Sequence, residues 1–357
     1  MKKQRSESTE LGVIVGPTRY MEPSTGEVKH TLDLFDLDRH GLLGAPAEPD
    51  RIALEFFAHG FTTNPARPWQ AALFEKRGPG GACVDLATLR VLAPIAPLAG
   101  HAFYGHGAFT QDGARLLAVE MNLATRDGVI TIRDAADFSV IDQFPSFGAA
   151  PHDCHLIEDG AVLAITNGGG ALADSRRLPS VTFVDVASHK LLERCEVDNP
   201  RINAGHIATL PGREFALVSA PRDGIAETSV GGISLRRGKS ALKQMREPKH
   251  ITERMVGESL SVAIHGPSRA VLATHPYGHL ATLWDLDSGQ ISAAGDLQSA
   301  RGVTLTLDGR YFAVSAGAQA GLLLFTASPF ALVAGRDPGR GRFGGSHIYA
   351  WRRCAAA

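Results

Sequence analysis

The sequence predicts an all-β protein with the fold of a seven-bladed β-propeller, and three observations lead to that prediction. First, His59, His106, His152 and His206 stand 47, 46 and 54 residues apart. Second, turn residues separate pairs of short apolar runs after most of these histidines. Third, a further apolar run in most units ends in or near Asp. A fixed period of about fifty residues indicates a repeat architecture, and four strands per unit are typical of a propeller blade.

The first two strands of each unit are predicted from the turn residues between them. Asp112-Gly113, Asp159-Gly160 and Asp308-Gly309 each stand next to a short apolar run such as Arg115–Val119. Asp-Gly between apolar runs is a strong hairpin signal, and we expect positive φ at both turn residues. The third strands are expected to end at a recurrent acidic residue, which stands at Asp85, Asp134, Asp185 and Asp285.

The number of blades follows from the innermost strands, which are expected to begin near residues 59, 106, 153, 206, 260, 302 and 347. The last of these, residues 347–351, has no partner strands after it. At the N-terminal end of the chain, three strand-like segments have no inner strand of their own: residues 11–15, 30–35 and 51–56. One C-terminal strand and three N-terminal strands would therefore complete the seventh blade and close the ring. We expect a polar tail over residues 1–10 and one propeller domain over 11–357.

Composition excludes two classes of partner. The 36 basic and 37 acidic residues nearly balance, so we expect no nucleic acid partner. No apolar run approaches the ~18 residues of a membrane-spanning helix, so no membrane insertion is expected. The basic stretch from Arg236 to Lys249 is predicted to be a solvated loop. Cys83, Cys154 and Cys195 fall on predicted strands, where cysteine packs as a small hydrophobe, and a place for Cys154 in a site is the alternative. Residues 1–10 hold no signal-peptide hydrophobic region, so the protein is expected in the cytosol unless a leader has been removed.

The recurrent histidines are predicted to form a site. They fall at the N-terminal ends of the inner strands, which should meet at one mouth of the central channel together with the loops that follow the second strands. Imidazole is a common ligand of transition metals. The candidate metal ligands are His59, His106, His152, His155, His206 and His347. The candidate ligand-binding residues on the same face are Glu120, Asn122, Asp153, Asn167, Arg222 and His275.

Several functions are compatible with such a site. The favoured one is a non-enzymatic propeller that binds a small ligand or a divalent transition metal (iron, copper or zinc). A lactonase-like hydrolase is the second, with Glu120, Asp153 or His106 as the base or as the group that activates water. A protein-interaction scaffold with an inert channel is the third. The ring could instead bind an anion when protonated, or its histidines could simply hydrogen-bond neighbouring strands in a wet channel.

Several motifs resemble those of a known family. They are Phe103–Phe109 with Asp112-Gly113, Gly148–Asp153, Asn167-Gly168-Gly169, Leu178–Val181, and Ala273–Gly278 before Trp284-Asp285. Together they resemble the bacterial domain-of-unknown-function family 1513, propellers related to the quinoprotein and lactonase-like propellers. The resemblance implies an exported, periplasmic protein, usually with a twin-arginine leader. It also implies a setting in iron acquisition beside imelysin-like and dihaem-peroxidase-like proteins.

The same resemblance bears on the histidines. His59, His106, His152 and His206 match the family's motif histidines. The family's C-terminal Trp-Asp-Asn-His-like motif appears here only as Gly345–Ile348. Because the family has no established reaction, the resemblance implies a setting and not a mechanism.

Overall fold

The protein is an all-β structure. The computed structural model describes residues 10–40, 48–174, 176–317, 321–333 and 343–354. Within these ranges the helical elements are α1 (Leu37–His40), α2 (Lys249–Thr252) and one 3₁₀ turn at Glu158–Gly160. No helix in the described ranges has the length and apolar character needed to span a membrane.

Most strands form antiparallel sheets of four in which neighbours in sequence are neighbours in the sheet. The first of these sheets contains β12 (Pro151–Ile157), β13 (Val162–Asn167), β14 (Ser180–Asp185) and β15 (Leu191–Glu196). The second contains β16 (Ile207–Leu210), β17 (Glu214–Ser219), β18 (Gly232–Arg236) and β19 (Lys243–Gln244). The third contains β20 (Ser261–His265), β21 (Ala270–His275), β22 (Leu280–Asp285) and β23 (Ile291–Asp296). The fourth contains β24 (Val303–Leu305), β25 (Tyr311–Ala316), β26 (Gly321–Ala327) and β27 (Phe330–Leu332).

The remaining strands make two sheets with different connections. One combines the two ends of the chain: β28 (Tyr349–Trp351) pairs with β1 (Val13–Met21), followed by β2 (Val28–Asp36) and β3 (Asp50–Leu54). The other has eight strands because β5 pairs with β8 as well as with β4 and β6. Its strands are β4 (Ala58–Asn64), β5 (Arg67–Gly78), β6 (Gly81–Asp85), β7 (Arg90–Pro94), β8 (His101–Phe109), β9 (Arg115–Asn122), β10 (Asp127–Asp134) and β11 (Val140–Ala149).

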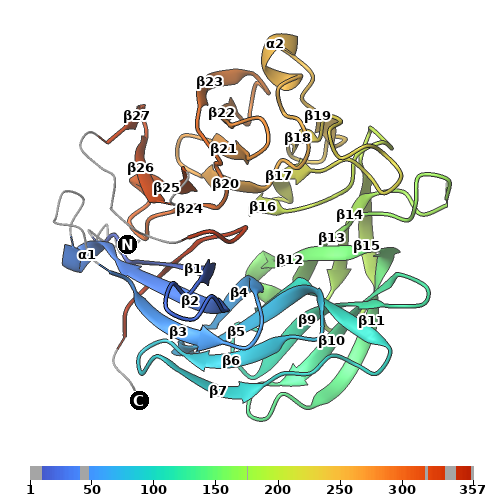
Figure 1. Ribbon diagram of the computed structural model, residues 1–357. Coiled ribbons are helices and arrows are strands. Elements are labelled where there is room, and N and C mark those ends of the chain that lie inside the picture. Colours follow the sequence, from blue (N-terminus) through green and yellow to red (C-terminus); the bar gives the residue numbers. More distant parts are fainter. Residues whose placement is uncertain (1–9, 41–47, 175, 318–320, 334–342, 355–357) are drawn as a thin grey trace, which may run out of the picture.

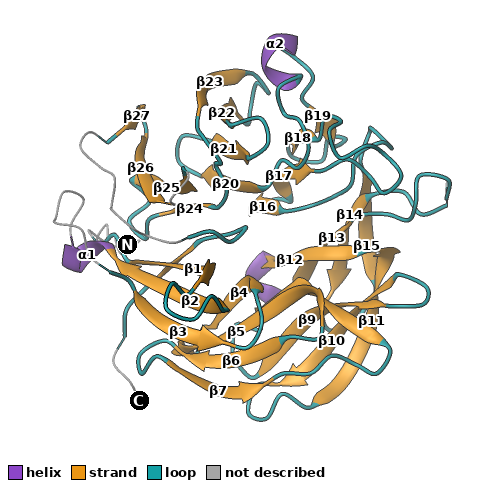
Figure 2. Ribbon diagram, viewed as in Figure 1, coloured by secondary structure: helices purple, strands orange, loops and turns teal. Residues whose placement is uncertain are grey.

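The sheets are arranged around a common centre. In Figure 1, strands such as β4, β12, β16 and β20 lie toward the centre, and β7, β15, β19 and β23 lie toward the rim; Figure 2 shows how little helix accompanies them. Successive central strands contact one another from β4 through β8, β12, β16, β20 and β24 to β28. The apolar core lies between neighbouring sheets, as where Leu117 and Ile130 pack with Leu163 and Val184. The N-terminal ends of the central strands are thereby held side by side.

The turns explain two of the sequence repeats, with one correction. The expected positive φ at both turn residues is found at Asp159 and Gly160, with 54° and 84°. Gly113 and Gly309 have φ of 66° and 71°, but Asp112 and Asp308 do not have the positive φ expected of them. Their carboxylates instead accept hydrogen bonds within the turn, for example from Thr110 at 2.6 Å. The aspartates at the ends of the third strands do the same for the next turn, as Asp185 accepts from the Ser188 amide at 2.7 Å. Asx turns of this kind are a physical reason for the repeat.

The basic stretch is only partly solvated. Arg236 is 2% exposed and ion-pairs with Glu193, so this end of the predicted solvated loop is buried instead. The predicted packing role of the cysteines agrees with the structure: Cys83, Cys154 and Cys195 lie on β6, β12 and β15 as free thiols.

Candidate functional site

Irregular strand pairing turns the predicted histidines toward one another. The pairing of β4 with β5 shifts between Ala58 and Gly60, on either side of His59. Corresponding shifts interrupt β8 around His106 and β12 around His152. A bulge re-aims a side chain out of the regular alternation of a strand, and bulges are frequent at functional sites. His206 and His347 need no bulge, because His206 immediately precedes β16 and His347 lies two residues before β28.

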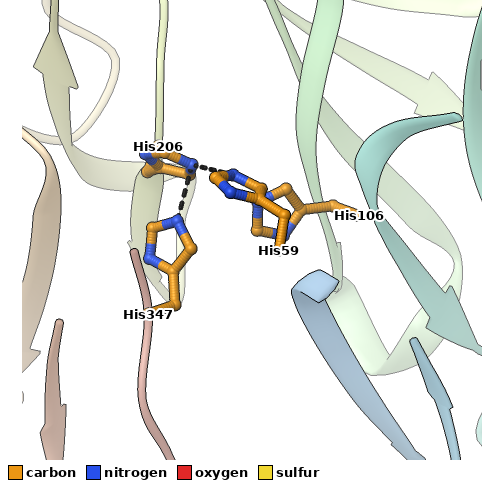
Figure 3. Close-up of side chains that lie close together, drawn as sticks. All are labelled: His59, His106, His206 and His347. Atoms are coloured by element: carbon orange, nitrogen blue, oxygen red, sulfur yellow. Dashed lines mark hydrogen bonds between the residues drawn. The ribbon is translucent and has the colours of Figure 1, made fainter. Parts of the chain in front are cut away.

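Five histidine rings meet at the centre of the protein: His59, His106, His152, His206 and His347, here called the histidine cluster. Side-chain nitrogens of four of them, all except His152, lie within 4.8 Å of one another. Figure 3 shows these four rings converging from strands that are distant in sequence. The Nε2 atom of His206 lies 3.1 Å from that of His59, 2.6 Å from that of His152 and 2.8 Å from that of His347.

Two glycines make this approach sterically possible. A Cβ at Gly105, where φ is 112°, would lie 2.4 Å from the His59 ring. A Cβ at Gly302, which immediately precedes β24, would lie 2.8 Å from the backbone carbonyl carbon of His347. The absence of side chains at these two positions therefore leaves room for His59 and for the segment that carries His347.

Oxygen acceptors outside the cluster orient two of the rings. Nδ1 of His152 lies 2.9 Å from the carbonyl oxygen of Tyr104. Nδ1 of His106 lies 3.2 Å from Oδ1 of Asp153. A carbonyl and a carboxylate can only accept, so both Nδ1 atoms carry the proton and both Nε2 atoms carry a lone pair. The Nε2 of His106 is buried without a hydrogen-bond partner. Hence these two rings direct lone pairs into the cluster.

The cluster is buried and uncharged. Its five side chains belong to residues that are 4–7% exposed. Burial lowers the pKa of His106 to about 4, against the opposing effect of Asp153. Burial is also the main reason that the pKa values of the other four lie well below 6.5, with further lowering from neighbouring histidines. Neutral imidazole is the form that binds metals.

Asp153 lies just outside the cluster, and its carboxylate contacts His106 and two backbone amides beside the cluster. Its carboxylate accepts from the amides of Cys154 at 2.8 Å and Ile207 at 3.1 Å, in addition to its contact with His106. Burial alone would raise the pKa of Asp153, but His106 and His155 outweigh burial and keep this pKa below its usual range. Asp153 is therefore an anion next to the Nδ1 atom of His106. Its assignment as a ligand-binding residue stays a prediction.

The sixth predicted metal ligand lies apart from the cluster. His155 has a side chain that is 41% exposed, and its Nε2 is 3.4 Å from Oδ2 of Asp153. The carboxylate raises the pKa of His155 against the lowering effect of burial. His155 is thus linked to the cluster only through Asp153.

The other predicted ligand-binding residues make internal contacts. Glu120 is fully buried and ion-pairs with Arg133 at 2.7 Å, and it also accepts from the Thr131 hydroxyl at 2.7 Å. The amide of Asn167 lies between the strands, 2.6 Å from the Ser146 hydroxyl. Asn122 accepts from the amides of the turn that follows β9.

Arg222 and His275 are also held by neighbouring groups. The Arg222 guanidinium donates to five carbonyl oxygens, which belong to Gly170, Ala171, Asp174, Arg177 and Pro200. It therefore organises the loop after β13. His275 is fully buried between the hydroxyls of Ser259 at 2.7 Å and Thr282 at 2.8 Å. Their assignment as ligand-binding residues stays a prediction.

Two cavities lie on different sides of the cluster. The larger, of about 680 Å³, runs along the central strands and is lined by His106, His206 and His347 among others. The smaller, of about 50 Å³, is lined by His152 together with Lys76 and Glu258. These two charged residues pair at 3.5 Å. The cluster therefore separates the channel from the opposite face.

Sequence reasoning missed two groups that contact the cluster. The Ser261 hydroxyl lies 3.4 Å from Nδ1 of His347. Ser261 starts the fifth central strand, at the place where other units carry histidine. Comparison of the repeats position by position would have found it. The Tyr104 carbonyl has no sequence signal, because its role depends on the backbone and not on the side chain.

Comparison with known proteins places this architecture in a family. Residues 52–336 match the family model described as a protein of unknown function, DUF1513. The chain belongs to the DUF1513 family. His59, His106, His152 and His206 of this DUF1513 protein lie within the matched range, and His347 lies beyond it. No curated protein matches the chain.

Solved structures similar to the DUF1513 chain support a propeller-like fold. A chain of Kuenenia stuttgartiensis hydrazine synthase aligns with a TM-score of 0.68 and 12% identity, covering 92% of this chain and 99% of its own. Dihydro-heme d1 dehydrogenase NirN in complex with DHE aligns with a TM-score of 0.54 and 16% identity, covering 93% and 74%. At these identities the likeness shows the fold alone.

Proposed function

We propose that this protein binds a divalent transition-metal ion at the histidine cluster, and that binding, not catalysis, is its role. The observation that carries the proposal is the contact of the His206 Nε2 atom with three other Nε2 atoms at 2.6–3.1 Å. One imidazole nitrogen offers one proton or one lone pair. At most one of the three contacts can therefore be a good hydrogen bond.

The orientation of His152 shows that the three contacts of the His206 Nε2 atom have too few protons for all of them to be hydrogen bonds. Its Nε2 carries a lone pair, since its Nδ1 donates to Tyr104. If His206 donates to His152, it has no second proton for His59 or His347. If His206 accepts from one of them, its lone pair faces that of His152. A cation at the centre removes the conflict, because every Nε2 lone pair can then point at the metal.

The surroundings suit such an ion. Imidazole binds zinc, copper, iron and nickel, and a histidine ligand usually donates its other ring N–H to a carboxylate or carbonyl. Asp153 and Tyr104 supply these acceptors for His106 and His152. The carboxylate also offsets part of the metal's charge in a buried place. The iron-acquisition setting, with partners of the imelysin or dihaem-peroxidase type, rests on the family resemblance alone.

We favour binding over hydrolysis because the two carboxylates proposed as bases already have partners. Glu120 is paired with Arg133, and Asp153 accepts from two amides and His106. Neither carboxylate is placed to activate water as it stands.

Complete ring closure is part of the proposal. We propose that the strands over residues 11–357 form one closed seven-bladed propeller. Support comes from the pairing of β28 with β1 and from Trp351, whose indole N–H donates to the Pro68 carbonyl at 2.7 Å. Closure of this kind leaves only short, protected strand edges.

The test of function is metal content and metal-dependent stability of the untagged protein. We expect close to one equivalent of one metal, and a higher melting temperature with that metal than after its removal. A ligand present at a hundredfold excess over its Kd stabilises the folded state by about 2.7 kcal/mol. His106→Ala with His206→Ala should abolish both effects. His275→Gln, at a buried histidine outside the cluster, should preserve them. Equal melts with zinc, copper, nickel, cobalt and ferrous iron would refute the proposal.

A further inference from the structure

The spacing of the nitrogens bears on the coordination number of the proposed metal. With metal–imidazole distances of about 2.0–2.1 Å, two ligands at a right angle stand about 2.9 Å apart and two at the tetrahedral angle about 3.4 Å. The three separations from Nε2 of His206, 2.6, 2.8 and 3.1 Å, fit the right angle. Right-angle ligands belong to octahedral or square-based sites and not to tetrahedral zinc sites.

The cluster does not supply enough ligands to complete an octahedron. It offers at most five imidazoles, and the remaining described histidine nearby, His155, lies on the far side of Asp153. At least one position of a six-coordinate ion is therefore left for a ligand from outside the protein.

The two cavities indicate where that position lies. His106, His206 and His347 line the cavity of about 680 Å³, which has room for a small molecule. The pocket on the other side holds about 50 Å³ and is bounded by His152 and the Lys76–Glu258 pair. Access from the larger cavity is thus the open route. Hydroxyl groups along its wall, from Thr62, Thr209, Thr304 and Ser261 among others, make this route polar.

Charge balance indicates what kind of ligand would enter. A divalent ion held by neutral imidazoles brings two positive charges into a buried site. Asp153 is the one acidic residue among the described residues that line the larger cavity. Lys76 and Glu258, near the smaller pocket, compensate each other. A surplus positive charge in a buried place is costly, and an anion on the metal would offset it.

We propose that the metal keeps an exchangeable coordination position facing the central cavity, and that this position binds a small inorganic anion. The inference rests on the proposed metal-binding function and gives that site a ligand class. It involves no bond making within the protein: the anion replaces water on the metal and leaves again unchanged.

The experiment uses cobalt(II) as the metal and azide as the anion. Cobalt(II) has visible absorption bands whose intensity and position report coordination number. We expect the full-length protein to take up cobalt(II) with the weak bands of a five- or six-coordinate ion. Addition of azide should shift these bands and add a ligand-to-metal absorption that saturates.

A pair of variants tests the route of entry. Ala208 lines the cavity two residues after His206, and it is partly buried at the edge of an apolar core. Ala208→Glu places a carboxylate in the cavity, and Ala208→Gln is its uncharged match. Repulsion across several ångströms should make azide binding to Ala208→Glu at least about tenfold weaker than to Ala208→Gln.

Each outcome has a separate meaning. No cobalt(II) bands at all would refute the metal-binding function itself. Cobalt(II) bands that azide leaves unchanged would preserve metal binding and overturn the exchangeable position. Azide binding that is equal in the two Ala208 variants would overturn entry from the central cavity. Azide binding that is weakened by the glutamate alone would support the inference in full.

Discussion

His347 and His206, separated by 141 positions in sequence, bring their Nε2 atoms within 2.8 Å and their ring centroids within 3.9 Å. His347 lies two residues before β28, the strand that pairs with β1 near the other end of the chain. The histidine cluster is therefore complete only when the C-terminal segment is docked against the N-terminal sheet. If the cluster binds a metal as proposed, binding is physically coupled to assembly of the chain ends.

We predict that His347→Ala weakens cobalt(II) binding at least about tenfold, because it removes one lone pair from the centre of the cluster. Isothermal titration calorimetry measures the effect. His155→Ala is the matched control, since His155 lies outside the cluster with a side chain that is 41% exposed. An unchanged affinity in His347→Ala would exclude this histidine as a ligand.

Asp153→Asn should weaken metal binding about 10- to 100-fold, in the range seen when a carboxylate behind a metal-binding histidine is lost. Cys154 and Ile207 donate to different oxygens of Asp153, and the single amide oxygen of Asn keeps only one of these two hydrogen bonds. The substitution removes the negative charge next to the Nδ1 atom of His106. Affinity is measured by competition with a chelator, and the metal-free melting temperature serves as the control for folding. Wild-type affinity in a well-folded Asp153→Asn would contradict the supporting role of the carboxylate.

The sequence predicted the repeat and the shared position of the histidines because both depend on local patterns. Turn residues, apolar alternation and spacing are visible in one dimension. The structure brings five of the six predicted metal ligands together, including His347, whose motif matches the family least well. The order of the strands within the sheets also follows from sequence order.

Other features were hidden because they depend on three-dimensional contacts. The bulges at His59, His106 and His152 are not visible in a pattern of alternation. The sequence predicts Glu120 as a ligand-binding residue because it ends a strand near a loop, and this stays a prediction. Its partner Arg133 lies on the neighbouring strand β10, and only the strand register brings the two together. Charged residues that pair inside a sheet therefore resemble site residues in sequence.

His275 should make the metal-free protein sensitive to mild acid. Burial lowers its pKa from 6.5 to about 3, so the folded state keeps it neutral where the unfolded state takes up a proton. Its stabilising contribution is complete above pH 6.5 and is lost as the pH falls toward 3. Between pH 6 and pH 4 the loss should be about 1.4 kcal/mol per pH unit.

The comparison of His275→Gln with wild type isolates this contribution. Gln can still donate to one hydroxyl and accept from the other, but it does not titrate. Urea unfolding at several pH values should give a free energy of unfolding that falls less steeply with acid in the variant. His279→Gln, at an exposed histidine on the adjacent turn, is the control. Parallel pH profiles for wild type and His275→Gln would show that His275 is protonated in the folded protein.

Trp351 provides the test of ring closure. Its side chain is 3% exposed and packs with Val13 and Leu32 of the N-terminal sheet and with Leu73 and Val84 of the next group of strands. If the ring is closed there, Trp351→Ala should reduce the free energy of unfolding by about 3–5 kcal/mol, the range for buried aromatic residues cut back to alanine. Leu332→Ala, at an exposed position of β27, should change it by less than about 0.5 kcal/mol.

The same Trp351→Ala variant should also bind metal less tightly. His347 is held in the cluster by the strand that Trp351 anchors, so loosening that strand lowers the fraction of molecules in which the site is complete. Calorimetric titration of the variant, at a temperature where circular dichroism shows it folded, measures this loss. A destabilised Trp351→Ala with wild-type metal affinity would show that the chain ends close the ring without controlling the site. A fully stable Trp351→Ala would argue against closure at this contact.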